Sequence, residues 1–449
     1  MAFRRALNVF DATMVVVGGI IGSGIFMLPS VVAQRLPSSG LVLLAWLVGG
    51  GIALAGAFAF AELATLFPKA GGEYVYLREA YHPLIAFLFG WASLLMIQGG
   101  GLGAVAITFS QYTLRLLGRD SSGSRVSAAA AIAIAVVAAV NVVGVKPGSR
   151  LLNVLVVLKL GALAVLIGGG LLLHPAPPPP PAAAAAPAAA VPFSLLAFGT
   201  ALVPILFAYG GWQSVNLLAE ETTEPRRTLP RALMAGTAIV ITVYVLANVV
   251  YLSVLSRAGL AATPTPAAAA VSRIFGPGAD RLISAAIAVS AFGFLDLTLL
   301  AQTRIYYAMG LDGVFLPALG RLHPRFQTPA LAIGLQAAWG IVLVLTGTYG
   351  DLVDSVVFGD WIFFGLTVAA VFRLRRRHPV EARDPGAFRL PGHPLVPALF
   401  VAAALLVVAS AIQSNPKRSA VGAALLAAGI PVYVYYDRRM ASKSAAGRD

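Results

Sequence analysis

The chain has 449 residues, of which 59% are hydrophobic and only 11% are charged. Because soluble globular proteins carry about 25% charged residues, this composition predicts an integral membrane protein. The formal net charge of +14 does not indicate nucleic-acid binding, since the Lys and Arg lie in short loops between apolar runs. Cysteine is absent, which excludes disulfides and thiolate metal sites.

Apolar runs of about 20 residues, the length that crosses roughly 30 Å of hydrocarbon, follow one another along the whole chain. They cover residues 11–34, 40–66, 84–117, 126–144, 148–173, 193–219, 231–255, 281–309, 329–348, 352–372, 395–413 and 419–436. The first run is too long for the hydrophobic region of a cleavable signal peptide, so we expect it to be the first transmembrane segment. The sequence predicts an all-α polytopic membrane protein with 12 transmembrane helices.

The distribution of positive charge predicts the orientation in the membrane. Most of the 32 Lys and Arg residues fall in loops and tails on the side of the N-terminus, although the loop with Arg115, Arg119 and Arg125 is an exception. Because cytoplasmic loops carry the excess of positive charge, we expect both termini in the cytoplasm. A multi-pass protein of the plasma (inner) membrane is the corresponding localisation.

Between the fifth and sixth runs lies a stretch of unusual composition, HPAPPPPPAAAAAPAAAVP, at residues 174–192. It is apolar but too rich in proline to form a spanning helix. We expect an extended, polyproline-like external linker. A docking site for a proline-binding module is the less favoured alternative.

Glycines interrupt two of the apolar runs at matching positions. The first run contains Gly22, Ser23 and Gly24 near mid-membrane, and the sixth contains Gly210 and Gly211. Each of these runs opens a set of five, and interrupted segments at corresponding positions of two halves point to a transporter site between inverted repeats. One membrane domain over 1–449 would then comprise a first repeat at 11–173, the linker at 174–192, a second repeat at 193–372 and two additional C-terminal helices at 395–436.

The breaks themselves suggest a ligand, because unwinding frees backbone groups that an intact helix keeps bonded. The N–H groups of Ser23, Gly24 and Ile25 would open the second half of the first helix, whose positive dipole end suits a carboxylate. Freed carbonyls at 207–209 would suit an ammonium group. Ordinary glycine packing explains a single cluster equally well, but the matched pair favours a receptor for an α-amino acid.

Several stretches resemble the amino acid–polyamine–organocation (APC) transporter superfamily, particularly its L-type amino acid transporter-like branch. They are GIIGSGIFMLP at 19–29, FPKAGGEYVYLREAY at 67–81, FAYGGWQSVNLLAEETTEPRRTLPRAL at 207–233 and FRLPGHPLVPALF at 388–400. The resemblance runs over nearly the whole chain. It implies a LeuT-type fold, a 5+5 inverted repeat with two further helices, and alternating access to a central site.

The resemblance also assigns site residues by position. It places Ile20, Ser23, Gly24 and Ile25 at the substrate site on the first helix, and Phe207, Ala208 and Gly210 on the sixth. Phe207 matches an aromatic residue that gates the substrate from outside in relatives, and a packing aromatic is its plainer interpretation. Eukaryotic light-chain members bind a glycoprotein heavy chain through a cysteine. This chain has none, so we expect it to work without such a partner and to be prokaryotic.

Of the ionisable residues in the runs, three lie deep enough to be functional candidates, because a charge within the membrane costs roughly 2.5 to 3.5 kcal/mol. Lys159, in the fifth run, resembles the lysine that takes the place of a sodium ion in relatives. It would be either a permanently charged strut on the unwound first helix or a proton-coupling group. Asp296 could accept a proton, contact a cationic substrate or bond a neighbouring helix, and Asp360 raises the same question.

Charges near the ends of the runs have plainer interpretations. Glu62, near the end of the second run, is expected to be structural. Glu220 and Glu221, followed by basic residues at 226, 227 and 231, could form a charge network that latches the inner gate. A solvated loop is the alternative, because exposed ion pairs contribute little.

Other classes of protein lack support in the sequence. There is no metal-ligand spacing among the five His, no nucleophile beside a base, and no Walker-type phosphate loop, so we expect no catalytic residues, metal, cofactor or ATP. We predict a secondary active transporter for amino acids, favouring neutral ones, that works as an exchanger or a proton-coupled symporter in the lipid bilayer. A cationic amino acid or polyamine transporter and a non-transporting amino acid sensor are the alternatives.

Overall fold

The computed structural model describes residues 3–119, 123–173, 194–263, 265–346, 349–379, 387–414 and 416–446. Their regular structure is helical, and the one β-type pairing among them is an isolated bridge between Leu7 and Thr222. The proline-rich stretch at 174–192, expected to be an external linker, lies outside the described residues.

The first five membrane segments comprise the following helices. The first segment is α1 (Val9–Ile20) and α2 (Gly24–Arg35), which meet at a bend of 43°. The second is α3 (Ser39–Leu66), and the short α4 (Glu73–Ala80) follows it. The third consists of α5 (Pro83–Ala92), the π-helical turn η1 (Ser93–Ile97) and α6 (Gln98–Leu116). The fourth and fifth are α7 (Gly123–Val143) and α8 (Val145–Leu173).

The second half begins with another broken helix. It comprises α9 (Leu195–Ala208) and the 3₁₀ helix η3 (Trp212–Glu221). Then follow α10 (Pro225–Ala262), α11 (Pro266–Phe275), α12 (Asp280–Leu297), the π-helical turn η4 (Thr298–Gln302), α13 (Thr303–Leu311) and η5 (Pro317–Gly320). The chain ends with α14 (Ala330–Thr346), α15 (Tyr349–Arg377), α16 (Leu395–Ser414) and α17 (Pro416–Ala446).

These helices confirm the all-α polytopic class. Within the described residues, 9 helices are long and apolar enough to cross a membrane, and the bent pair α1–α2 raises the number to 10. The ninth and tenth segments expected from the sequence correspond to α14, a shorter apolar helix, and α15. The count of 12 crossings therefore stays a prediction.

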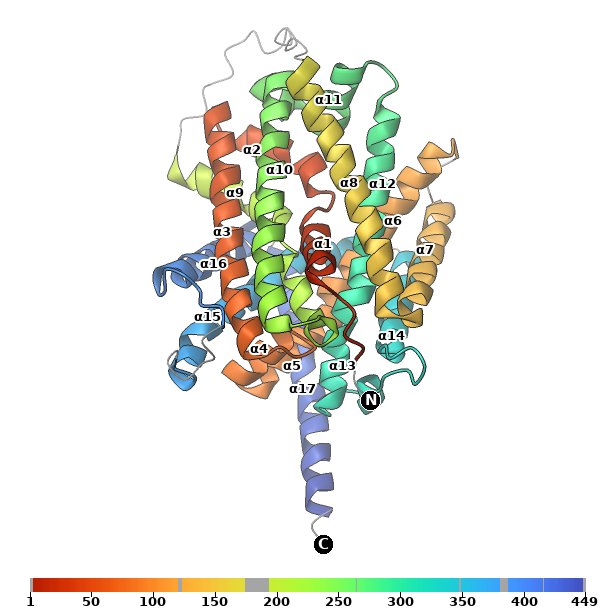
Figure 1. The fold of residues 1–449 in the computed structure, drawn as a ribbon, viewed down its shortest axis with the longest axis vertical. Helices are drawn as coiled ribbons and strands as arrows, with labels where there is room; N and C mark the ends of the chain where they lie inside the picture. The colour runs from red at the N-terminus through yellow and green to blue at the C-terminus, as the bar shows by residue number, and fades with distance from the viewer. Residues whose placement is uncertain are drawn as a thin grey trace.

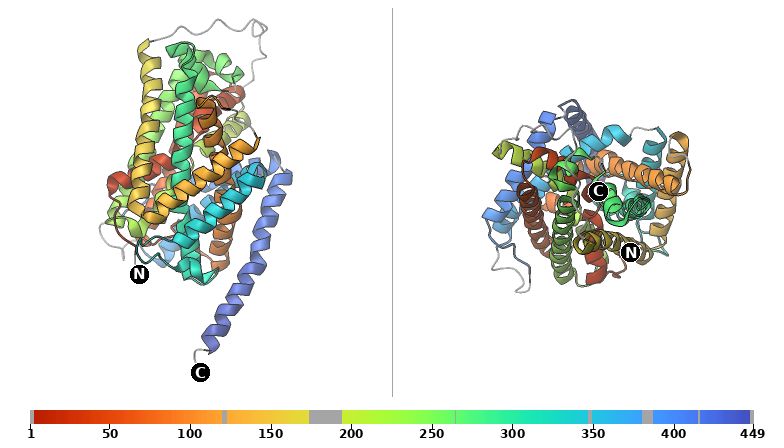
Figure 2. Two further views of the ribbon diagram at one scale, coloured as in Figure 1. Left: turned by 90° about the vertical axis from the view of Figure 1, so that its right-hand side faces the viewer. Right: turned by 90° about the horizontal axis from the view of Figure 1, so that it is seen from above.

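The two broken helices lie side by side at the centre of the bundle. Helix α1 packs against η3, and α2 packs against α9. In Figure 1, α1 lies between α10 and α8, and both chain ends lie at the bottom of the molecule. We call this the terminal side. Figure 2 shows α17 running along one edge and extending beyond the other helices on that side.

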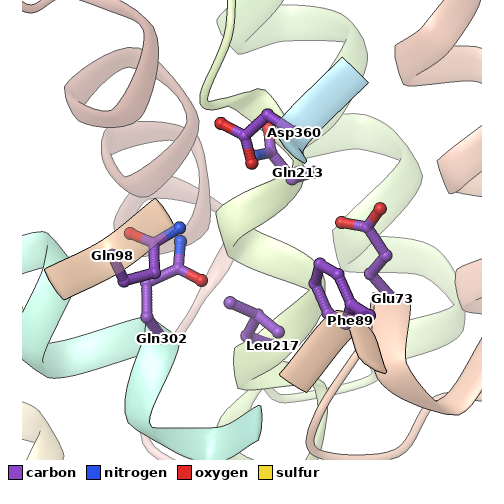
Figure 3. Close-up of a pocket in the computed structure, with 7 residues that line it drawn as sticks. All are labelled: Glu73, Phe89, Gln98, Gln213, Leu217, Gln302 and Asp360. Atoms are coloured by element: carbon purple, nitrogen blue, oxygen red, sulfur yellow. The ribbon is translucent and has the colours of Figure 1, made fainter. Parts of the chain in front are cut away.

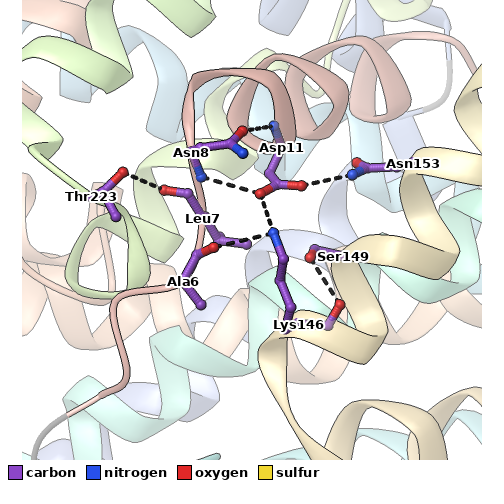
Figure 4. A network of polar contacts seen from close by, with 8 residues as sticks. All are labelled: Ala6, Leu7, Asn8, Asp11, Lys146, Ser149, Asn153 and Thr223. Atoms are coloured by element: carbon purple, nitrogen blue, oxygen red, sulfur yellow. Dashed lines mark hydrogen bonds and ion pairs between the residues drawn. The ribbon is translucent and has the colours of Figure 1, made fainter.

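The start of α1 is held by a polar network on the terminal side (Figure 4). Asn8 and Asp11 form a capping box in which each side chain accepts the other's backbone N–H. The Asp11 carboxylate also accepts from Lys146 Nζ at 2.6 Å and from Asn153 Nδ2 at 2.7 Å, both on α8. Preceding residues pair with the end of η3, where Thr223 N–H donates to the carbonyl of Leu7 at 2.8 Å. The terminal halves of both broken helices are thus tied to their surroundings.

Candidate functional site

The two helix breaks touch each other through bare backbone. A Cβ atom added to Gly19 would overlap the carbonyl of Gly211, and one added to Gly211 would overlap the backbone of Gly19. Gly211 also has φ +108, in the left-handed region that favours glycine. On the other side of the breaks, a Cβ at Gly24 would lie 3.1 Å from Cβ of Ala208. The glycines therefore allow two unwound segments to meet closely.

The break in the first helix exposes backbone donors. Helix α1 ends at Ile20, and α2 begins at Gly24 with Ser23 as its N-cap, whose side chain makes no capping hydrogen bond. The first N–H groups of a helix have no intrahelical acceptor. Ser23 is exposed, whereas Ile20 and Ile25 are buried. The start of α2 thus offers uncapped N–H groups at an exposed position, which is the environment that binds anions such as carboxylates.

The break in the sixth helix supplies acceptors. Helix α9 ends at Ala208, and the carbonyl of Phe207 accepts from Gly210 N–H at 3.1 Å. The side-chain Oε1 of Gln213 accepts from Gly211 N–H at 3.0 Å, so that the freed donor at this break is already satisfied. Phe207 is 47% exposed, while Ala208 is buried. This break presents mainly carbonyl oxygens to a ligand. Each carbonyl oxygen has a second lone pair that can accept a hydrogen bond.

Lys159 lies behind the first break. It is fully buried on α8, and its Nζ donates to the carbonyl of Ile21 at 2.7 Å and to that of Gly18 at 3.4 Å. Ser290 Oγ on α12 also donates to the carbonyl of Ile21, at 3.3 Å. These side chains satisfy carbonyls that lose their helical partners where α1 ends.

Tyr244 connects the two breaks directly. This fully buried residue of α10 places its hydroxyl 3.0 Å from the carbonyl of Ile20 and 3.3 Å from that of Ala208. Its ring packs against Trp46 and Tyr209, with centroids 5.7 Å and 5.0 Å away. Tyr244, Ser290 and Gln213 were not predicted from the sequence. The signal that could have found them is a polar group within an apolar run.

Asp296 is turned toward a neighbouring helix. It is fully buried on α12, and its Oδ1 accepts from Asn141 Nδ2 on α7 at 2.7 Å. Its Oδ2 is also buried and has no hydrogen-bond partner among the described residues. Asp296 therefore makes its hydrogen bond at the α7–α12 interface and not at either break.

Glu221 forms a different ion pair from the one expected from the sequence. Its carboxylate accepts from Arg304 of α13 at 2.7 Å and 3.1 Å, rather than from the arginines that follow it in the chain. This pair is fully buried because α13 packs directly on η3. Arg227 instead pairs with Glu224 on the surface at 3.5 Å. Glu62 forms a two-pronged pair with Arg375 at 2.9 Å and 2.6 Å, which joins α3 to α15.

No group of three or more His, Asp or Glu among the described residues is placed to hold a metal ion. The arrangement at the breaks offers neither a nucleophile nor a base beside one. It places helix-start donors beside helix-end acceptors, which suits a molecule that carries both an anionic and a cationic end.

Comparison with known proteins agrees with this geometry. The family model described as "Amino acid permease" matches residues 7–435. The chain is 32% identical over 446 residues to the serine/threonine exchanger SteT of Bacillus subtilis, covering 98% of each chain. It is 31% identical over 417 residues to the human b(0,+)-type amino acid transporter 1, covering 92% of this chain and 84% of that one. It is 30% identical over 449 residues to the human large neutral amino acids transporter small subunit 2, covering 98% and 82%.

A family match of this extent, together with two interrupted helices that meet at mid-bundle, identifies the fold as LeuT-type and the activity as transport rather than catalysis. The protein belongs to the amino acid permease family of the APC superfamily and is a multi-pass membrane transporter of amino acids.

Proposed function

We propose that the protein exchanges neutral amino acids across the plasma membrane, with serine and threonine as the first substrates to test. The observation that carries this proposal is the close contact of two helix breaks, one rich in donors and the other in acceptors. Of the relatives, the serine/threonine exchanger from B. subtilis matches over 98% of both chains, which supports exchange.

In this proposal the substrate's carboxylate binds the N–H groups at the start of α2, around Ser23, Gly24 and Ile25. The absence of a Cβ at Gly24 lets the carboxylate approach the backbone, and the positive end of the helix dipole favours its charge. The ammonium group binds carbonyls beside Ile20 and at the end of α9, near Ala208 and Gly210. These contacts recognise what all α-amino acids share.

Access would be controlled by Phe207 on one side and by ion pairs on the other. Phe207 and Ser23 are both exposed. On the terminal side, the pairs Asp11–Lys146 and Glu221–Arg304 tie α1 and η3 to neighbouring helices. With both termini in the cytoplasm, as the positive charges indicate, this arrangement supports a conformation that is closed to the cytoplasm and accessible from outside. Closure of Phe207 over the substrate would then precede opening on the terminal side.

Lys159 would act as a fixed cation in this cycle. Its ammonium bonds two carbonyls at the end of α1, a position where a bound metal cation would have to compete with it. We infer that transport does not require sodium. Lys159 either keeps its proton throughout the cycle or exchanges it in a symport cycle. Uptake driven by a pH gradient distinguishes the two.

One feature supports a neutral substrate, and another supports transport without a disulfide-linked partner subunit. The carboxylate of Asp296, which would favour a cationic side chain, lies at the α7–α12 interface beside Asn141 and not at either break. The human relative is named as a small subunit, but this chain has no cysteine for a disulfide-linked heavy chain. A cationic amino acid or polyamine substrate is the second candidate, which the competitor panel below addresses.

The test uses purified protein in liposomes loaded with unlabelled serine. We expect uptake of labelled serine to be stimulated by internal serine, and to be inhibited by external threonine and other neutral amino acids but not by arginine or polyamines. Replacing sodium with choline should leave the rate unchanged. Stimulation by an inward pH gradient in empty liposomes would indicate symport rather than exchange. Tight binding without any flux would contradict the proposal and favour a sensor.

A further inference from the structure

A small cavity lies on the terminal side of the break in the sixth helix, among η3, α4, α5, α6, η4 and α15 (Figure 3). Its polar lining consists of two carboxylates, Glu73 and Asp360, and three carboxamides, Gln98, Gln213 and Gln302. Phe89 and Leu217 complete it. Two of the glutamines lie at π-helical turns, since Gln98 follows η1 and Gln302 ends η4. Such turns often occur at functional sites because they redirect side chains.

The two acids come together through α4 and α15. Glu73 is buried at the start of α4, and its Oε1 accepts from the hydroxyl of Thr367 on α15 at 3.0 Å. Asp360 lies seven residues before Thr367 on the same helix, so both are on the face that packs against α4. Asp360 is partly exposed and has no hydrogen bond or ion pair with a described residue. Among the described residues, Asp360 thus has no hydrogen-bond donor, and Glu73 has only the hydroxyl of Thr367.

Among the described residues, no cation compensates these acids inside the cavity, because the lining that they form contains no Lys, Arg or His. Several charged groups on the surrounding helices pair with one another: Arg304 of α13 with Glu221 of η3, Arg375 of α15 with Glu62 of α3, and Arg78 of α4 with Asp312 and Glu79. Tyr76 of α4, a neutral phenol, lies near Glu73. Helices α5, α6 and η4 contribute no acidic or basic group to the lining.

Two ionised carboxylates in such a place repel each other, and the buried carboxylate of Glu73 also loses hydration. Burial, followed by the charge of Asp360, holds the pKa of the Glu73 carboxyl well above its usual value, while the hydroxyl of Thr367 opposes the rise. Pairs of carboxyl groups in this situation retain a proton that isolated ones would lose.

We propose that Glu73 and Asp360 form a proton-binding site, which holds one proton while the terminal side is closed and releases it to water when that side opens. The O–H bond of the carboxylic acid breaks, its electron pair stays on the carboxylate, and the proton passes to water and then to buffer. The proposal rests on the proposed function in one respect, that opening of the terminal side is a step of transport.

The sign of the pH effect follows from linkage. The closed state binds more protons than the open state, so lowering the pH on the terminal side favours the closed state, and raising it favours opening. Exchange that depends on opening should therefore slow in acid. The proton acts here on the rate of opening, whether or not it crosses the membrane with the substrate.

The first experiment measures serine counterflow in liposomes with equal pH on both sides, from about pH 5 to about pH 9. We expect the wild-type rate to fall at least several-fold toward acid. In the double variant Glu73→Gln/Asp360→Asn this acid limb should disappear, while the surface variant Glu224→Gln should keep the wild-type profile. A double variant with the wild-type pH profile would overturn the proposal. Complete lack of exchange in the wild type would instead contradict the proposed function.

The second experiment detects the proton without transport. Infrared difference spectra of the purified wild type should contain the C=O band of a protonated carboxylic acid at neutral pH. This band should be lost in Glu73→Gln and retained in Glu224→Gln. If Glu73→Gln does not fold, Asp360→Asn replaces it, and the band should then disappear at lower pH than in the wild type because the like charge is gone. An identical band in wild type and variants would refute the site.

The same spectra separate the proton from other cations. If sodium or arginine bound between the two carboxylates, adding either one would displace the proton and remove the protonated-acid band. That result would overturn the proton assignment. We expect no change with either cation.

Discussion

The hydroxyl of Tyr244 tests the paired breaks most directly. It contacts the carbonyl of Ile20 at 3.0 Å and that of Ala208 at 3.3 Å, one on each broken helix. Tyr244→Phe removes this oxygen but keeps the ring against its aromatic neighbours. The substitution therefore perturbs the connection between the breaks without leaving a large cavity.

The expected magnitude follows from the two contacts. A buried hydrogen bond contributes about 0.5–1.5 kcal/mol net, and a buried carbonyl left without a donor costs about 1–3 kcal/mol. A hydroxyl has one proton, and the contact with Ala208 is the longer, so we count one lost bond and partial rehydration of the carbonyl of Ile20. This gives about 1–2 kcal/mol, or about 5- to 30-fold in an equilibrium constant.

The assay is counterflow of labelled serine as a function of external concentration. We expect the half-saturating concentration for Tyr244→Phe to rise by about 5- to 30-fold, because the breaks are no longer held in the binding arrangement. The matched control is Tyr251→Phe on the same helix, whose buried hydroxyl has no partner among the described residues. It should behave like the wild type. Equal losses in both variants, or an unchanged affinity in Tyr244→Phe, would refute the assigned role.

Three further predictions concern the same core. Lys159→Ala leaves the carbonyl of Ile21 without its 2.7 Å donor, and should nearly abolish counterflow; wild-type rates would contradict both roles given to this lysine. Gly211→Ala places a Cβ on the backbone of Gly19 and should prevent folding or lower the melting temperature strongly. The control Gly161→Ala, in open space on α8, should keep the wild-type melting temperature in the same thermal scan. Asp11→Asn loses the ion pair with Lys146. It should reduce the free energy of unfolding by about 1–2 kcal/mol and increase labelling of α1 from the terminal side. Unchanged labelling would argue against a role of this ion pair in keeping the terminal side closed.

The sequence alone predicted the features that depend on local composition. The length and apolarity of each run indicate membrane helices, because each run must satisfy its own backbone in lipid. The glycines at 22, 24, 210 and 211 mark helix breaks because they act on the backbone next to them. A lysine inside an apolar run, such as Lys159, is conspicuous because a charge within the membrane is costly. The fold class and the two broken segments thus follow from short-range patterns.

The contacts between helices could not be predicted from these short-range patterns. The sequence places Tyr244 in an apolar run but does not reveal that its hydroxyl meets Ile20, 224 residues away. It does not reveal either that Asp296 faces Asn141 or that Glu221 pairs with Arg304 rather than with the arginines after it. Helical periodicity defines faces on each helix, whereas the rotation and tilt that choose the facing partner come from packing of all helices together. Tertiary structure therefore decided which polar groups complete the two breaks and which acids share the cavity beneath them.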